Sequence, residues 1–337
     1  MKTQSAPSQG TITSDQWPVV TIGLPVYQGE EFLAEAINCL LGQTYRNLEI
    51  IISDNCSTDR TQQICEEFAQ SDHRITYSRT ATNIGAAGNF NRVARMTNGT
   101  FFAWANHDDL WDSTYVEKCV EVLLREPSVV LAYAKSAKID ENGDTILKLN
   151  ADLGLNAAKP VNRLRRYHDL FADVDRRKAW GKEAIEGFWI PVYGVMRTDI
   201  LLKTRLIGDY ISSDTILVED LMMLGAFNEV DDILFFKRDH QKRSMRDSEA
   251  YDARAEWFTG KQPTRLLFPR WRALRERLRS AVVLPDGLGN KTACTSEMLL
   301  FYVRRRSEGN ALVKELIANL GRMFLGAQRG AQIFRKW

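Results

Sequence analysis

The sequence has no uninterrupted apolar run that approaches the length of a membrane-spanning helix. Its five cysteines are scattered, odd in number and include no CxxC pair, which favours a reduced, cytoplasmic setting. The net charge is only +2, so overall charge gives no reason to expect nucleic acid as a partner. Residues 1–16 are polar and lack the apolar segment of a secretory signal, which predicts a disordered leader.

Two glycine-rich signatures of nucleotide binding are also missing. No G-x-G-x-x-G follows the first expected strand, where only Gly23 and Gly29 flank the segment LPVYQ. This disfavours a domain that binds nicotinamide dinucleotides, and no G-x-x-x-x-G-K-[ST] occurs either. Any bound diphosphate is therefore expected to be held mainly by a metal ion rather than by a glycine-rich loop.

What is present is an ordinary globular composition, 44% hydrophobic and 26% charged, in which segments typical of strands and helices alternate. This alternation predicts an α/β fold with a mostly parallel sheet covered by helices on both faces. Strands are expected at 17–23, 48–52, 75–78, 101–105, 129–134, 187–195 and 230–237, and helices follow most of them, for example at 60–70, 86–96 and 115–124.

The stretch from Phe101 to Trp111, FFAWANHDDLW, reads as a buried strand that ends in Asp108 and Asp109. Two adjacent carboxylates at the end of an apolar strand are unfavourable unless something compensates their charge. A divalent cation is the usual partner, because magnesium and manganese prefer oxygen ligands. The alternative is that one of the two caps a helix that begins near Ser113.

Polar residues follow four of the expected strands. In a parallel sheet the carboxyl ends of the strands line one edge, so these groups would converge on a single ligand. Each motif alone is weak, since Asx turns and hairpin turns have similar sequences. The four segments are Pro25-Val26-Tyr27, Asp54-Asn55, Asn83-Ile84-Gly85 and His107-Asp108-Asp109.

Residues 19–143 resemble the nucleotide-binding half of a family 2 glycosyltransferase of the GT-A fold. The resemblance lies in PVYQGEEFLAEAINCLLGQTY, IIISDNCSTDRT, NIGAAGNFN and WANHDDLW, in that order. It implies a nucleotide-diphosphate sugar donor, Mg²⁺ or Mn²⁺, and inversion at the anomeric carbon. The sequence departs from the family in two places. The usual Asp-x-Asp reads Asn106-His107-Asp108, and the usual Asp-Asp pair after the second strand reads Asp54-Asn55.

The resemblance also implies roles for single residues. The metal would be held by Asp108 and Asp109, with His240 as a further ligand. The donor would be bound by Pro25, Tyr27, Glu30, Asp54, Asn55, Asn83, Gly85, Asn89, His107, Asp108 and Arg243.

A second acidic pair lies in the other half of the chain. Leucine spacing over 217–224 predicts a helix with Glu219 and Asp220 near its start. Acidic residues there also simply stabilise a helix dipole. Family 2 enzymes place an acidic pair in this region, and one carboxylate acts as general base. Asp220 fits that role best, with Glu219 beside it and Asp214 as the next candidate.

From residue 251 onward the expected helices are basic and amphipathic. Packing onto the catalytic domain is the first expectation, and peripheral attachment to the anionic inner face of a membrane is the second. The chain is thus divided into a leader, a GT-A domain at 17–250 and a helical extension at 251–337. The GT-A domain consists of a donor half, 17–143, and an acceptor half, 144–250.

The expected function is that of a metal-dependent inverting glycosyltransferase. It would move a sugar from a nucleotide-diphosphate donor to a hydroxyl of a glycan or lipid-linked acceptor, in cell-surface polysaccharide synthesis. Two other functions stay open. A sugar-phosphate nucleotidyltransferase should begin with a glycine- and arginine-rich loop, which PVYQGEE lacks. A non-catalytic nucleotide-sugar-binding protein has no need of the pair Glu219 and Asp220.

Overall fold

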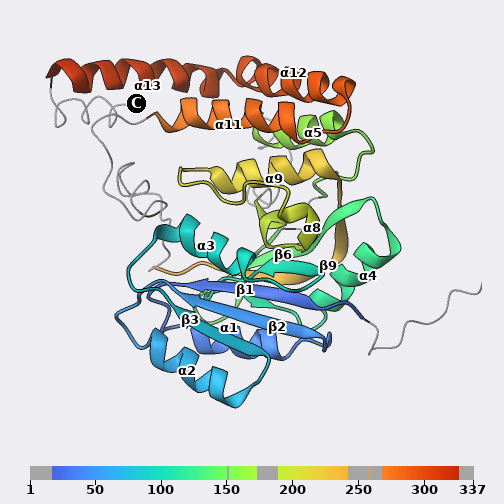
Figure 1. The fold of residues 1–337 in the computed structure, drawn as a ribbon, viewed down its shortest axis with the longest axis vertical. Helices are drawn as coiled ribbons and strands as arrows, with labels where there is room; N and C mark the ends of the chain where they lie inside the picture. Colours follow the sequence, from blue (N-terminus) through green and yellow to red (C-terminus); the bar gives the residue numbers. More distant parts are fainter. Residues whose placement is uncertain (1–16, 150–151, 173–188, 242–256, 258–267, 326–337) are drawn as a thin grey trace, which may run out of the picture.

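The computed structural model describes residues 17–149, 152–172, 189–241, 257 and 268–325. The expected leader, 1–16, and Arg243, expected to bind the donor, lie outside these residues. A single mixed sheet forms the centre of the described part, with strands in the order β3-β2-β1-β4-β8-β6-β9-β5 and β7 paired with β6 (Figure 1).

The first half of the sheet is parallel, as the alternating sequence predicts. It comprises β1 (Val20–Val26), β2 (Leu48–Asp54), β3 (Ile75–Arg79) and β4 (Phe101–Trp104). The helices that connect or follow these strands are α1 (Leu33–Leu41), α2 (Thr61–Ser71), α3 (Gly85–Arg95) and α4 (Tyr115–Arg125). Because β1 and β4 lie side by side, their carboxyl ends bring residues 27 and 106 to the same edge.

The second half of the sheet contains antiparallel pairings. β8 (Val195–Arg197) is antiparallel to both β4 and β6 (Val129–Ile139), and β9 (Ala226–Arg238) runs parallel to β6. The two-residue strand β5 (Leu110–Trp111) pairs antiparallel with the end of β9. This last pairing places the end of β9 beside the segment that directly follows Asp109. β7 (Thr145–Leu149) pairs with β6 at the margin.

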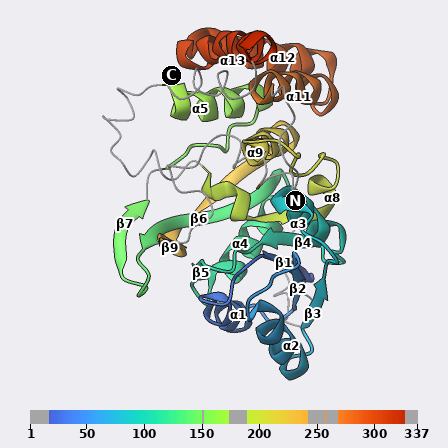
Figure 2. The ribbon, with the colours of Figure 1, turned by 90° about the vertical axis from the view of Figure 1, so that its left-hand side faces the viewer.

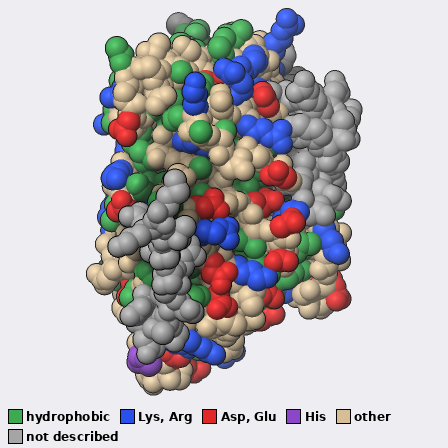
Figure 3. All heavy atoms as spheres, turned by 90° about the vertical axis from the view of Figure 1, so that its right-hand side faces the viewer, with side chains coloured by type: hydrophobic (Ala, Val, Ile, Leu, Met, Phe, Trp, Pro, Cys, Tyr) green, Lys and Arg blue, Asp and Glu red, His purple; other side chains and the backbone are tan. Residues whose placement is uncertain are grey.

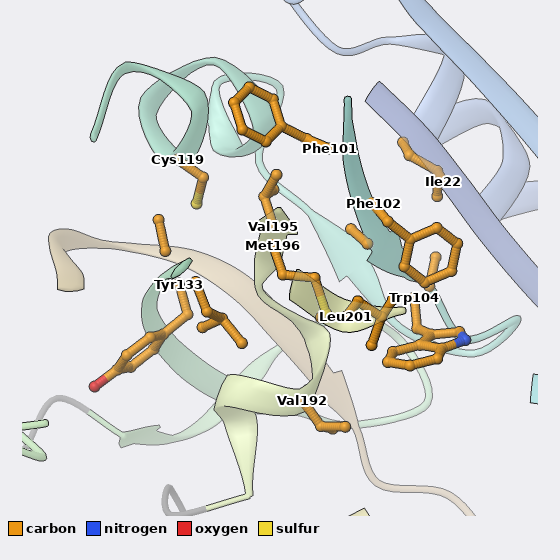
Figure 4. Packing of buried hydrophobic residues seen from close by; sticks show 14 of the residues in the cluster. Ile22, Phe101, Phe102, Trp104, Cys119, Tyr133, Val192, Val195, Met196 and Leu201 are labelled. Carbon is orange, nitrogen blue, oxygen red and sulfur yellow. The ribbon is translucent and has the colours of Figure 1, made fainter. Parts of the chain in front are cut away.

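The core lies on both faces of the central strands, which explains why their sequences are continuously apolar. Every residue of β1 and of β4 is buried. Figure 4 shows Phe102 and Trp104 of β4 beside Met196 of β8 and Ile22 of β1. The Phe102 and Trp104 rings meet edge to face at 4.9 Å, a favourable aromatic geometry. This packing fixes β4, and with it the turn that carries the two carboxylates.

Helices form layers on either side of the sheet (Figures 1 and 2). Helices α1 and α2 lie on one side, and α9 (Ser213–Leu224) lies on the other. Beyond α9 come α5 (Pro160–Ala172) and α11 (Pro269–Val283), and α12 (Leu288–Arg304) and α13 (Arg306–Leu325) form the outermost layer. No helix among the described residues is both long and apolar enough to cross a membrane.

The expected α/β fold with C-terminal helices is confirmed, but two local expectations are wrong. Within the expected strand 187–195, the described residues 189–194 are not in a strand. Most of them form the 3-10 helix η2 (Ile190–Tyr193), because Pro191 lacks the N–H that a strand needs. β8 begins only at Val195, and α8 (Thr198–Leu201) follows it. Glu219 and Asp220 lie in the second half of α9 rather than near its start, since α9 begins at Ser213.

A buried ionic network joins the C-terminal helices to the rest of the fold. Arg277 of α11 donates to both oxygens of Glu219 on α9, at 2.8 and 3.1 Å, and to the Tyr302 hydroxyl at 2.9 Å. His168 of α5 bonds Glu297 of α12 at 3.0 Å. Charged groups are buried only when paired in this way. The expectation that the C-terminal helices pack onto the preceding domain therefore agrees with these contacts.

We expect Arg277→Ala to unfold the protein more easily, because it leaves the Glu219 carboxylate buried without its cation. Removing one partner of a buried pair typically costs about 3–5 kcal/mol. Urea denaturation followed by circular dichroism measures this loss. Arg275→Ala is the control, since that arginine lies on the same helix but is exposed. It should cost less than about 0.5 kcal/mol. Equal losses would contradict a central role for the buried pair.

Candidate functional site

The carboxyl edge of β1 and β2 is built around Asn55. Its backbone N–H donates to the carbonyl of Val26 at 2.9 Å, which ties the end of β2 to that of β1. Its side-chain oxygen accepts from Ile84 N–H at 2.8 Å, and its amide donates to Asn83 Oδ1 at 3.0 Å. Asn83 Oδ1 also accepts from the N–H of Gly85, whose φ of +77° suits glycine. The structure thus brings these predicted donor-binding residues together.

Asn89 of α3 stabilises the same edge through hydrogen bonds to the ends of β1 and β2. Its amide donates to the carbonyls of Ser53 and Val26, at 2.8 and 3.3 Å, and its oxygen accepts from the Ser53 hydroxyl. Both ends of this side chain are satisfied inside the protein. Asn89 therefore supports the donor edge, and its described contacts give no direct role in holding a ligand.

Asp54 is fully buried at the end of β2. One oxygen accepts from Ser57 N–H at 2.8 Å, and the other accepts from Arg79 Nε at 2.9 Å and the Tyr77 hydroxyl at 3.3 Å. Arg79 lies directly beside Asp54 in the β2–β3 pairing. Sequence reasoning missed Arg79, although a basic residue that ends a strand next to a strand ending in Asp is a usable signal.

The loop after β1 presents an accessible surface next to this edge. Pro25 lies buried within β1, and Tyr27 follows the strand with 43% of its surface exposed. Glu30 is exposed and accepts from Arg60 N–H at 3.0 Å. A Cβ on Gly29 would lie 3.0 Å from the His107 ring, so the loop approaches the turn after β4 closely.

Asp109 is held inside the protein by three donors. Lys237 Nζ of β9 donates to Oδ2 at 2.8 Å, Asn106 Nδ2 donates to the same oxygen at 2.8 Å, and Arg238 N–H donates to Oδ1 at 3.1 Å. Burial acts to lower the pKa of Lys237, but the charges of Asp109 and Asp108 raise it above its usual range. Lys237 is therefore a fixed cation beside the turn.

Asp108 has a different environment. His240, just beyond β9, bonds its Oδ2 through Nε2 at 3.1 Å. Burial opposes ionisation of Asp108, but the charge of Lys237 and the hydrogen bond from His240 hold its pKa below the usual range. The sequence predicted both residues in one site, and the structure brings them into contact. His107, beside them, is half-buried.

Neither carboxylate caps the following helix, which was the alternative interpretation. The acidic residue at the start of α4 is Asp112, whose Oδ1 accepts from the N–H and the hydroxyl of Thr114 at 2.9 and 2.6 Å. Asp108 and Asp109 instead contact residues that end β9. Their burial is thus explained by contacts across the sheet rather than by local helix capping.

Arg238 locks this arrangement in place. It is fully buried, donates from Nε to the carbonyl of Asp108 at 3.1 Å, and pairs with Glu35 of α1 at 2.7 Å. Its guanidinium also lies 4.6 Å from the Phe32 ring, which in turn contacts the His240 ring. The sequence identified the loop after β9 but not Lys237 or Arg238 as its anchors.

The donor set fits a divalent cation with few protein ligands. A carboxylate and an imidazole, Asp108 and His240, are oxygen and nitrogen ligands that Mn²⁺ or Mg²⁺ accepts, with phosphate oxygens and water completing the shell. Asp109 fits less well, because Lys237 and Asn106 already occupy its Oδ2. Within the described residues no three His, Cys, Asp or Glu side chains form a ready-made metal cluster.

The acidic residues of α9 lie on different faces of the helix. Glu219 faces Arg277 and His168, and Asp220 lies 3.9 Å from Arg205 and near Ser280 of α11. At about 100° per residue, Asp214 lies roughly 120° around the helix from Asp220. The structure therefore does not bring Glu219 and Asp220 to the Asp108 turn through any described contact.

Asp214 lies in the first turn of α9, and its charge acts on Tyr193, a residue beside Lys237. The phenol of Tyr193 has a raised pKa, mainly through burial, and the charges of both Asp109 and Asp214 contribute. The ring centroids of Tyr193 and Trp189 lie 5.5 and 5.7 Å from Lys237 Nζ. Burial raises the pKa of Asp214 itself.

Comparisons with known proteins bear on the family and the fold of the chain. The sequence profile described as Glycosyl transferase family 2 matches residues 21–181. An uncharacterized glycosyltransferase of Rickettsia typhi is 30% identical over 136 residues, covering 40% of this chain and 42% of that protein. A putative teichuronic acid biosynthesis glycosyltransferase, TuaG of Bacillus subtilis, is 28% identical over 131 residues, covering 39% and 52%. The chain thus spans less than two thirds of the length of these relatives.

Among solved structures, S. aureus TarS (residues 1–349) in complex with UDP-GlcNAc resembles this chain in fold. The TM-score is 0.61 at 14% sequence identity, covering 91% of this chain and 81% of that one. At this identity the likeness concerns the fold alone. Because it covers 91% of this chain, it includes part of the C-terminal helices. The signature segments after β1, β2 and β4 all lie within the matched residues 21–181. Residues 21–181 of the chain thus match glycosyl transferase family 2, and the fold of the chain resembles that of TarS.

Proposed function

We propose that this protein is a metal-dependent inverting glycosyltransferase that moves a sugar from a nucleotide-diphosphate donor to a hydroxyl of a glycan or lipid-linked acceptor. The observation that carries the proposal is the pair formed by Asp108 and His240, at 3.1 Å, beside the buried cation Lys237. Asp108 and His240 lie 132 residues apart in the sequence and meet at the carboxyl edge of the sheet, where α/β folds bind ligands.

The chemistry follows from the charges that develop in the reaction. Displacement at the anomeric carbon leaves negative charge on the departing diphosphate and positive charge on the sugar. A divalent cation at Asp108 and His240 would supply the countercharge for the diphosphate. Lys237 and Arg238 hold the turn rigid, so that Asp108 stays oriented before the donor binds. The exposed Tyr27 ring and the edge formed by Asn55 and Asn83 suit the nucleoside.

A general base must accept the proton of the attacking hydroxyl. The family resemblance favours Asp220 for this role, whereas the contacts of α9 favour Asp214. Asp214 begins the helix and its charge reaches Tyr193, which borders Lys237. Asp220 instead faces α11 and Arg205, and Glu219 is engaged by Arg277. We therefore propose Asp214 as the base and a structural role for Glu219 and Asp220.

The two other functions remain weaker proposals. A nucleotidyltransferase would need its signature loop after β1, where the chain instead has Gln28 at a φ of +53°, bonded to Thr58. A non-catalytic binding protein has no need of a general base such as the one we propose at Asp214. Turnover of a nucleotide sugar in the presence of Mn²⁺, followed as slow donor hydrolysis, separates the three.

Replacement of the metal ligand tests the donor site. We expect Asp108→Asn to lower the metal-dependent affinity for UDP or GDP by at least about 10- to 100-fold, the loss typical even for residues that only support a metal ligand. Isothermal titration with and without Mn²⁺ measures it. Asp232→Asn, at an exposed ion pair with Lys118, serves as the control and should bind normally. Unchanged affinity in Asp108→Asn, or activity that survives excess chelator, would refute the metal site.

The base is tested by a pair of isosteric changes. We expect Asp214→Asn to lower kcat by about 10²–10⁴-fold, with donor affinity nearly unchanged, because the residue accepts a proton but does not hold the diphosphate. Asp220→Asn and Glu219→Gln should change kcat much less. Steady-state kinetics at saturating donor give the comparison. A large loss in Asp220→Asn together with full activity in Asp214→Asn would restore the base predicted from the sequence.

The structural role proposed for Asp220 predicts a pH dependence of the free energy of unfolding. Burial raises the pKa of Asp220 to about 7, above the value of about 3.9 expected in the unfolded chain. The folded protein then holds a proton that the unfolded chain has lost. The free energy of unfolding therefore falls as pH rises from about 4 to 7, on the order of a few kcal/mol at most.

Asp220→Asn removes this pH dependence. Urea denaturation should show the variant gaining stability relative to the wild type between about pH 5 and pH 8. A difference between the two proteins that is independent of pH would mean that Asp220 is already ionised in the fold.

A further inference from the structure

Helix α13 buries two polar residues and leaves most of its described large apolar residues exposed. The described inward residues include Glu315 and Asn319, which are buried, beside Leu312 and Ala318. A surface helix normally buries its apolar face instead. The outward residues have about half of their surface exposed, 45–55%, and recur at helical spacing: Val313, Leu316, Ile317, Leu320 and Met323.

Specific bonds fix this rotation of the helix. The Glu315 carboxylate accepts from the backbone N–H groups of Arg270 and Trp271 at 3.1 Å, and so caps the start of α11. The Trp271 indole donates to the carbonyl of Leu312 at 3.0 Å, and Arg270 pairs with Glu308 at 2.8 Å. Turning the apolar residues inward would break these contacts and leave α11 uncapped. The apolar face is thus held outward by the fold.

Helix α12 extends the same surface. Cys294, Met298 and Phe301 pack inward, whereas Leu299, Leu300 and Val303 are exposed. Figures 1 and 2 both place α12 and α13 in the outermost layer, farthest from the sheet. Exposed apolar side chains gathered on the outermost helices in this way mark an interaction site. We call it the outer stripe, formed by Leu299, Leu300, Val303, Val313, Leu316, Ile317, Leu320 and Met323.

The outer stripe lies in the basic part of an otherwise acidic protein. Residues 268–337 contain 14 Lys and Arg and 5 Asp and Glu, a net charge of +9. Residues 1–267 contain the other 31 basic and 38 acidic residues, a net charge of −7. Exposed Arg304 and Arg306 lie at the junction of α12 and α13, and exposed Lys314 lies beside Val313. Figure 3 shows basic and hydrophobic side chains interspersed over the upper part of the molecule.

We propose that the outer stripe docks onto an anionic lipid surface, with its apolar residues in the headgroup layer and the basic residues around them facing the lipid phosphates. An amphipathic helix with a basic margin binds membranes in this manner. A second copy of the chain is a poorer partner. A twofold dimer would place this surface against itself and bring two segments of charge +9 together.

Vesicle flotation of the full chain tests the proposal, with vesicles of phosphatidylcholine alone and of phosphatidylcholine mixed with phosphatidylglycerol. The wild type should float with the anionic vesicles only, and less so at high salt. The combined variant Leu316→Gln, Ile317→Gln and Leu320→Gln should bind on the order of 100-fold more weakly. Arg306→Gln and Lys314→Gln should each lose about fivefold.

The control replaces two equally exposed apolar residues far from the stripe. Ile146→Gln with Leu202→Gln changes residues that are 55% and 50% exposed in β7 and next to α8, and should bind as the wild type does. Thermal melting and UDP or GDP binding should be alike in all variants, which separates this test from that of the catalytic site. Wild-type flotation by the triple variant, or equal binding to neutral vesicles, would overturn the proposal. So would a concentration-dependent dimer, seen by sedimentation velocity, that the triple variant abolishes.

Discussion

The ion pair between Lys237 and Asp109 is the interaction on which the site depends. Two neighbouring carboxylates at the end of a buried strand repel each other and lose hydration. An ammonium at 2.8 Å from one of them compensates that cost within the protein. Among the described residues, His240 is the one side chain that bonds the Asp108 carboxylate, which stays available to a ligand. In the proposed site Asp109 therefore has a structural role, and Asp108 is the carboxylate that would bind the metal.

The sheet topology makes this pairing possible. β9 runs parallel to β6 and ends beside β5. Residues 237–240 therefore lie next to the turn after β4, which contains Asp108 and Asp109. Arg238 then connects that turn to Glu35 on α1. The C-terminal helices add a second layer of buried charge through Arg277 and Glu219, which fixes α9 and therefore the position of Asp214. Both halves of the proposed active site are thus set by long-range ion pairs.

The parallel half of the fold could be predicted because its signals are local. Apolar strands, polar turns and helical spacing predict β1 to β4 and the residues at their ends. That His240 would join Asp108 was implied only by the family resemblance. What could not be predicted are the partners chosen across the sheet. No sequence signal near Asp109 indicates that Lys237 is its partner. Leucine spacing alone also did not show that α9 starts at Ser213. That shift of a few residues decides which carboxylate of α9 we propose as the general base.

The late return of β9 also has a consequence for how the chain folds during synthesis. The ribosome releases the four parallel strands well before residues 226–240, and until β9 arrives β5 has no partner and Asp109 has no ammonium. Contacts between such distant segments form slowly, because a long loop must first close. Nascent chains that end before β9 would therefore have an incomplete sheet edge that is prone to misassembly. Binding of the donor could not stabilise them, because the proposed site also needs residues 237–240. Completion of the site and completion of the central sheet are therefore the same late event.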